Sequence, residues 1–149
     1  MPERKTVNRA RKAAKAGKAP STQAGEFVHE EIEHIREGKH GARSAKQAIA
    51  IGLSKARRAG VKLPPPPKTA SARTREGAKR DSARAGKTTR PSASRSRAAK
   101  RALADEPRAA ASTTALSRHA KAAAKRRPAK ARKAAARKAA RTRARREQS

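Results

Sequence analysis

The sequence contains no cysteine, tryptophan or tyrosine, and Phe27 is its single aromatic residue. Without cysteine, the chain can form neither a disulfide framework nor a thiolate zinc site. With one aromatic ring, it cannot build the stacking platform on which single-strand-binding proteins hold successive bases. The longest apolar run covers residues 48–53, whereas a membrane-spanning helix needs roughly 20 residues. We therefore expect no membrane span.

Acidic residues are also scarce, since 11 Asp and Glu face 42 Lys and Arg and leave a formal net charge of +31. The net charge is +6 over residues 1–20, +3 over 21–63 and +22 over 64–149. A field of this size attracts polyanions such as DNA, RNA or polyphosphate, and anionic membrane surfaces. No apolar segment follows the basic N-terminus, so we expect no secretory signal and a cytoplasmic location.

Large apolar side chains are few, and nine of the thirteen Val, Ile, Leu, Met and Phe residues lie between positions 27 and 63. Ordering a residue costs about 1–2 kcal/mol in backbone entropy, which the flanks have little burial to offset. The expected fold class is therefore a mostly disordered chain with a small all-α element. The expected parts are a disordered basic arm (1–20), a helical hairpin domain (21–63), a flexible linker rich in Pro, Ser and Thr (64–107), and a basic tail rich in Ala, Lys and Arg (108–149).

The hairpin domain shows two helical patterns, over residues 23–37 and 45–59. Apolar residues of the first pattern recur at spacings of three and four, which places them on one stripe of a helix. Ser44 and Gln47 form a capping box at the start of the second. Two helices joined by a short link form an αα-hairpin. Its predicted core consists of Phe27, Val28, Ile32, Ile35, Ile49 and Leu53.

The second helix carries more contact surface than one hairpin requires. Ala48, Gly52 and Ala56 form a groove of small residues, and Ile51 lies about 200° around the helix from Ile49. Two interpretations remain open. Ile51 is either a lone exposed side chain, which is common, or part of a second contact surface, for example in a homodimer that forms a four-helix bundle. The candidate interface residues are Ala48, Ile51, Gly52 and Ala56.

The segment GEFVHEEIEHIREGKHGARSAKQAIAIGLSKARRAGVKLPPP resembles a short domain of unknown function found in small, basic bacterial proteins. The resemblance covers about residues 23–66, and KQAIAIGLSKARRAG at 46–60 is its most specific part. It implies a bacterial source and a helical hairpin, and it implies no activity.

The sequence motifs give little support for a metal site or a catalytic site. In HEEIEH (29–34) the residue four after His29 is Glu33, so this is not the zinc-protease motif. Glu31 and His34 match the Glu-x-x-His spacing of di-iron bundles, but the second helix supplies no further carboxylate unless a homodimer duplicates the motif. The acidic side chains have another use, since they could hold the chain's own basic tail. We assign no metal, cofactor or catalytic residue and expect no enzyme activity.

The tail combines good helix formers with strong charge repulsion. Residues 108–127 and 129–146 are rich in Ala, the best helix former. Lys133, Arg137 and Arg141 stand four apart, so their charges repel along one helix face. We therefore expect these segments to become helical on binding DNA. The tail resembles the Lys/Ala-rich tails of linker histones and bacterial histone-like proteins.

These features predict a histone-like, nucleoid-associated architectural protein that binds DNA without sequence specificity by neutralising phosphates. One alternative is an RNA- or ribosome-associated basic protein. Another is an adaptor whose hairpin binds a protein partner while the tail tethers it to nucleic acid. The predicted phosphate contacts are Lys121, Lys125, Arg126, Arg127, Lys130, Arg132, Lys133, Arg137, Lys138, Arg141, Arg143, Arg145 and Arg146.

Overall fold

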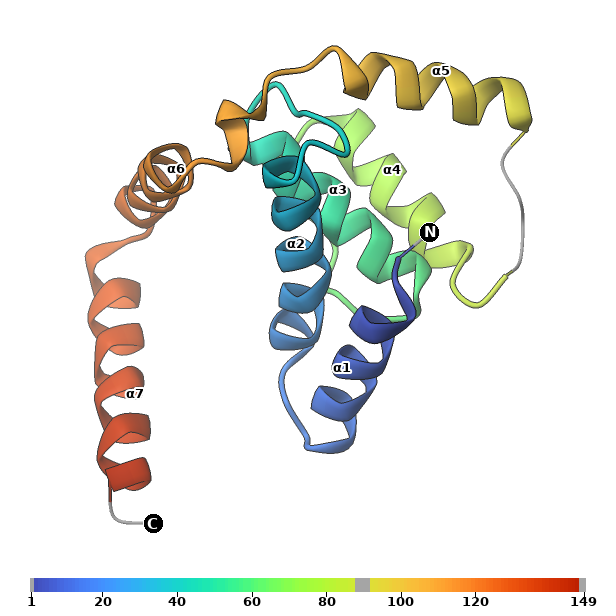
Figure 1. Ribbon diagram of the computed structural model, residues 1–149. Helices are drawn as coiled ribbons and strands as arrows, with labels where there is room; N and C mark the ends of the chain where they lie inside the picture. The colour runs from blue at the N-terminus through green and yellow to red at the C-terminus, as the bar shows by residue number, and fades with distance from the viewer. Residues whose placement is uncertain (1, 88–91, 148–149) are drawn as a thin grey trace. The chain divides into compact units, whose positions relative to one another are not determined.

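The computed structural model describes residues 2–87 and 92–147, and these residues form helices and connecting segments without a strand. The chain forms two compact units, Met1–Ser112 and Thr113–Ser149. Figure 1 labels the α-helices along the chain. In chain order the elements are α1 (Arg4–Lys15), α2 (Pro20–Arg36), α3 (Ala45–Arg58), α4 (Ala72–Ala83), α5 (Ala93–Ala104), the 3-10 turn η1 (Arg108–Ala111), α6 (Thr113–Lys125) and α7 (Ala129–Glu147).

The expectation of a mostly disordered chain is wrong. The segment predicted to be a disordered arm contains α1, and the segment predicted to be a flexible linker contains α4 and α5. Two physical reasons explain the difference. Ala, Lys and Arg favour helix wherever Gly and Pro are absent. In addition, the first unit buries small residues that a count of large apolar side chains overlooks, among them Thr6, Ala10 and Ala78.

α1 packs against the hairpin through its small residues. Ala10 joins Ala24, Phe27 and Ala56 in one buried cluster, against which Val7 and three side chains of the first unit pack at the edge. An ion pair of 3.0 Å between Arg9 Nε and Glu26 Oε2 lies beside this contact. The small side chains let the backbones of α1, α2 and α3 approach closely around the single Phe.

The αα-hairpin is formed by α2 and α3. α2 begins at Pro20, a favoured residue in the first helical turn. It ends at Arg36, and two residues later Gly38 has a φ of 77°, which suits glycine. Ser44 Oγ accepts a hydrogen bond from the Gln47 backbone N–H (3.2 Å), and Gln47 Oε1 accepts one from the N–H of Arg43 (2.7 Å). These bonds fix the start of α3, one residue after its N-cap.

The buried face of α3 is built from its small residues, Ala45, Ala48, Gly52 and Ala56. A Cβ atom added to Gly52 would lie 2.7 Å from Val28 Cα, so the two backbones are in direct contact. The groove considered as a dimer interface therefore already holds α2. Among the predicted core residues, Phe27, Ile32 and Ile35 are buried, while Val28, Ile49 and Leu53 are half-buried.

α4 covers another face of α3. Ser54 Oγ donates a hydrogen bond of 2.6 Å to Asp81 Oδ2, and Arg58 Nε lies 3.7 Å from Asp81 Oδ1. Ile51 lies three residues before Ser54 and seven before Arg58, so it shares their helix face. Its side chain is half-buried. The second contact surface of α3 is therefore occupied by a helix of the same chain, as the packing of α3 and α4 in Figure 1 shows.

The end of α5 and the segment after it pack on α2 and on the link between α2 and α3. The N–H of Gly41 donates to Leu103 O (2.7 Å), and the N–H of Ala42 donates to Pro107 O (3.1 Å). Arg36 Nε donates to Ala111 O at 3.1 Å. A side chain at Gly41 would collide with the backbone at Glu106, so this position requires glycine.

The second unit consists of α6 and α7, separated at Pro128. Pro128 cannot continue α6 because it lacks a backbone N–H. Its carbonyl accepts from the N–H of Arg132 (3.1 Å) in the first turn of α7. Every side chain that the structure describes in α7 is exposed. Of the helices in the described ranges, none combines the length and the apolar character needed to cross a membrane.

Candidate functional site

Two features of the chain concentrate functional side chains. The first is the set of cations on α6 and α7. The structure places Lys121 and Lys125 on α6 and Arg126 and Arg127 in the break that follows. The remaining nine predicted phosphate contacts lie on α7, although the side chain of Arg146 is outside those that the structure describes.

The cations of α7 are distributed unevenly around the helix. At about 100° per residue, six of them fall within an arc of about 140°. We call this set the basic stripe. Arg132 and Arg143 project from the opposite side of the helix, where Ala is the main other residue. The basic stripe consists of Lys130, Lys133, Arg137, Lys138, Arg141 and Arg145.

The charges of the second unit have almost no internal partner. Residues 113–149 hold fourteen Lys and Arg and one Glu. Within the described part of this unit, and leaving Arg145 aside, none of the Lys and Arg side chains pairs with a carboxylate. In the first unit, by contrast, ion pairs join Arg9 to Glu26 and Arg43 to Glu106. The second unit therefore presents its positive charge to solvent.

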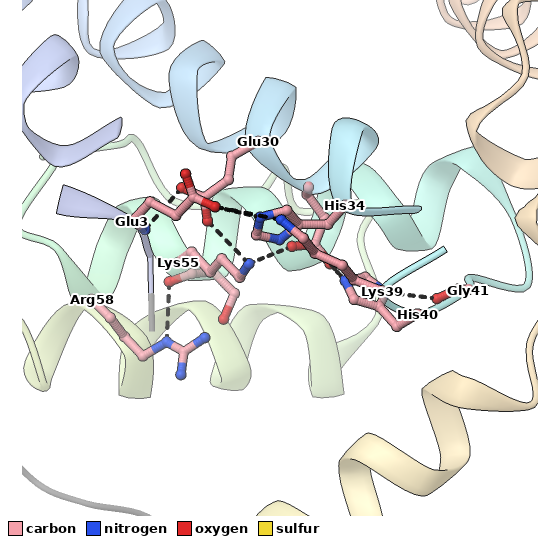
Figure 2. Close-up of polar contacts among 10 residues, drawn as sticks. Glu3, Glu30, His34, Lys39, His40, Gly41, Lys55 and Arg58 are labelled. Atoms are coloured by element: carbon pink, nitrogen blue, oxygen red, sulfur yellow. Dashed lines mark hydrogen bonds and ion pairs between the residues drawn. The ribbon is translucent and has the colours of Figure 1, made fainter. Parts of the chain in front are cut away.

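The second feature is a polar cluster between α1, α2 and α3, which we call the Glu/His/Lys cluster. Figure 2 shows most of its side chains converging from these helices and from the link after α2. Glu30 and Glu31 are 4% and 1% exposed. Lys55 Nζ lies 2.6 Å from Glu31 Oε2 and 3.4 Å from Glu30 Oε1, so one ammonium group serves two buried carboxylates. The cluster consists of Glu3, Glu30, Glu31, His34, Lys39, His40 and Lys55.

Glu3 connects α1 to this cluster. Its backbone N–H donates to Glu30 Oε2 (3.0 Å), and its Oε1 lies 2.9 Å from His34 Nε2. The hydrogen bond to His34 lowers the pKa of the Glu3 carboxyl, and the nearby Lys39 ammonium acts in the same direction. The hydrogen bond and ion pair with Glu37 raise the pKa of Lys39. The start of α1 is thus held by charged contacts to α2 and to the link that follows it.

His40 reaches the cluster from the link after α2. The Nδ1 atom of His40 lies 3.1 Å from Gly41 O, and its Nε2 atom lies 3.2 Å from Glu31 Oε1. One metal-ligating atom from each of Glu31, His34 and His40 lies within 4.8 Å of the others. Glu31 and His34 were paired by their spacing in the sequence, but His40 was not associated with them. The sequence signal was the pair of glycines near His40, Gly38 and Gly41. They indicate that the chain turns back after α2, which brings His40 toward this helix.

Because Glu30 and Glu31 are buried and paired with Lys55, they are not available to the basic tail. Glu33 is engaged by Arg36 at 3.0 Å within α2. Glu30, Glu31 and Glu33 therefore have partners within the first unit. The sequence-based alternative, in which the acidic side chains hold the tail, does not apply to the buried Glu30 and Glu31.

Comparison with known proteins finds a family that matches the first part of the chain. Residues 3–68 match a family described as "Family of unknown function (DUF6496)". The match covers α1, α2 and α3, and thus extends the resemblance from residues 23–66 to the helix that packs on the hairpin. It ends before α4 and does not include the second unit. No curated protein and no solved structure matches the chain.

Proposed function

We propose that the protein binds duplex DNA without sequence specificity and acts as an architectural, histone-like component of the nucleoid. The observation that carries the proposal is the exposed, largely unpaired positive charge of α6 and α7. Lys and Arg side chains that contact phosphates release condensed counterions, and this release supplies the free energy of nonspecific binding.

The chemistry of the second unit supports neutralisation of phosphates rather than reading of bases. Base recognition in the major groove requires side chains held in a fixed geometry, typically bidentate Arg, Asn or Gln. On α7 the neighbours of the cations are mostly Ala, which hold no Arg side chain in place. A helix of 19 residues is about 28 Å long, so its charges can follow phosphates over several base pairs.

The salt dependence of DNA binding tests this proposal. Binding of a labelled duplex is measured by fluorescence anisotropy, for the full chain and for residues 1–112, at several salt concentrations. If about ten cations of the second unit contact phosphates, the slope of log K against log salt is near −9 for the full chain. We expect the truncated chain to show a much shallower slope and at least a hundredfold weaker binding at about 150 mM salt.

Circular dichroism of both chains verifies that the first unit stays helical in the truncated protein. Equal slopes for the two chains would contradict the proposal, because the charge of the second unit would then make no phosphate contacts. Competition between the duplex and a structured RNA of equal phosphate number separates DNA from RNA. Preferential displacement by the RNA would overturn the assignment to DNA and favour an RNA-associated role.

A further inference from the structure

We propose that Glu31, His34 and His40 bind a divalent transition-metal ion, for which Zn²⁺ is the probe. This site lies in the first unit and is independent of the DNA binding proposed for the second. Two imidazoles and one carboxylate form the ligand set of several zinc sites, in which a water completes the tetrahedron. One ligand atom from each of the three residues already lies within 4.8 Å of the others.

The spacing of two of these atoms fits a shared ion. Zinc bonds to imidazole nitrogen and carboxylate oxygen are about 2.0–2.2 Å long, so two ligands of one tetrahedral ion lie roughly 3.3–3.5 Å apart. Glu31 Oε1 and His40 Nε2 are 3.2 Å apart. Small rotations of the two side chains would therefore suffice to place one ion between them.

Hydrogen bonding of the histidine rings supports the same conclusion. His40 Nδ1 lies 3.1 Å from the carbonyl oxygen of Gly41, to which it can only donate. The other ring nitrogen, Nε2, then remains to bind a metal ion, and it faces the carboxylate of Glu31 at 3.2 Å. His34 shows the related arrangement, because its Nε2 is bonded to Glu3 Oε1 at 2.9 Å. Metal-binding histidines commonly have their second nitrogen bonded to a carbonyl or a carboxylate in this way.

Glu31 also has one oxygen that Lys55 does not use. Its side chain is 1% exposed, and its two oxygens have different neighbours. Oε2 forms the ion pair with Lys55 at 2.6 Å, while Oε1 faces His40. Lys55 can therefore keep its place while Oε1 binds a metal ion.

The charge of the cluster favours a cation despite the basic chain around it. With neutral histidines, four carboxylates (Glu3, Glu30, Glu31 and the Glu37 that pairs with Lys39) outnumber the ammonium groups of Lys39 and Lys55 by two. A divalent ion would offset this excess next to the buried carboxylates of Glu30 and Glu31, where an unbalanced charge is costly. It would also join α2 covalently to the link after it, and thus stabilise the first unit.

Zinc titration of the full chain tests the site after nucleic acid and metal have been removed. Isothermal titration calorimetry should show one saturable Zn²⁺ site per chain. We expect Glu31→Gln and His40→Ala to weaken binding at least tenfold. His29→Ala is the matched control, since His29 is an exposed histidine on the same helix and lies outside the cluster. This variant should bind Zn²⁺ as the unmodified chain does.

A second measurement covers the case in which a variant fails to fold. In the unmodified chain, NMR signals of the His34 and His40 rings should shift with Zn²⁺, whereas those of His29 and His119 should not. Absence of saturable binding would overturn the proposal. Equal weakening by His29→Ala and His40→Ala, or shifts at His29 or His119 alone, would also overturn it.

Discussion

At the scale of single residues, small side chains decide how the first unit packs. Ala24, Ala48 and Ala56 are fully buried, and Gly52 brings α3 against the backbone of α2. A buried Ala removes little apolar area from water, at roughly 25 cal/mol per Å². It nevertheless permits close contact between backbones, so many dispersion contacts form around it. A basic chain with few large apolar residues can in this way still build a core.

Substitution of Gly52 by Ala should destabilise the first unit. Ala is the better helix former by about 0.5–1 kcal/mol, but its Cβ would lie 2.7 Å from Val28 Cα, a backbone atom that cannot rotate away. Overpacking of this kind costs about 1–3 kcal/mol, so the steric effect should prevail. Urea unfolding followed by circular dichroism measures the difference. Gly25→Ala is the control, because Gly25 is also helical and nothing lies within 4 Å of its added Cβ. We expect this variant to gain stability, and a loss equal to that of Gly52→Ala would refute the explanation.

Lys55→Met should be strongly destabilising at neutral pH. It leaves the carboxylates of Glu30 and Glu31 buried without their ammonium partner. Removal of one partner from a buried ion pair costs about 3–5 kcal/mol. Lys46→Met is the matched control, since Lys46 is exposed on the same helix, and it should change the free energy of unfolding by less than about 0.5 kcal/mol. Urea unfolding in the presence of a chelator compares the two variants, and similar stabilities would show that the cluster does not require Lys55.

At the scale of elements, α7 shows which of two opposing tendencies prevails in the tail. Like charges at i and i+4 cost about 0.2–0.5 kcal/mol per pair. Ala, Lys and Arg are all strong helix formers, and α7 contains neither Gly nor Pro. α7 is a helix without a polyanion, whereas its charge pattern predicts a helix that forms on DNA. Helix propensity thus outweighs charge repulsion in α7, which the charge pattern alone does not indicate.

If α7 binds DNA as a helix, the basic stripe should contribute more to DNA binding than the cations on the opposite side of the helix. Arg137→Gln with Arg141→Gln removes two cations from the stripe, and Arg132→Gln with Arg143→Gln removes two from outside it. The two double variants have the same net charge as each other. We expect the first to make the salt slope shallower by about 1.8 and the second by less than about 0.9. Anisotropy titrations with duplex DNA measure both slopes. Equal changes would show that α7 binds with all its sides or as a non-helical chain.

At the scale of the whole molecule, charge is divided between the two units. The acidic side chains of the chain lie in the first unit, with the exception of Glu147. Several of them pair there with Lys, Arg or His. The second unit has no comparable set of carboxylates, so its cations remain available to a polyanion. This division fits the proposal that the second unit, rather than the first, binds DNA.

Part of the fold and of the candidate site could be predicted from the sequence because it depends on local patterns. The periodicity of Phe27, Ile32 and Ile35 and the capping box at Ser44 indicated the hairpin and the start of α3. The packing of α1 and α4 could not be predicted in the same way. Contacts such as that of Ala10 with the hairpin leave no periodic signal, because Ala is also frequent on exposed helix faces.

The sequence by itself determined the composition of each part: a hairpin with most of the large apolar residues, a basic tail, and an excess of positive charge. These properties follow from residue types and their spacing. Only the tertiary structure decided what covers the two faces of α3, namely α2 against Gly52 and α4 beside Ser54. It also brought His40 to Glu31. Both outcomes depend on where distant segments meet in space, and close contact between small residues is a property of the packed backbones that residue types alone do not specify.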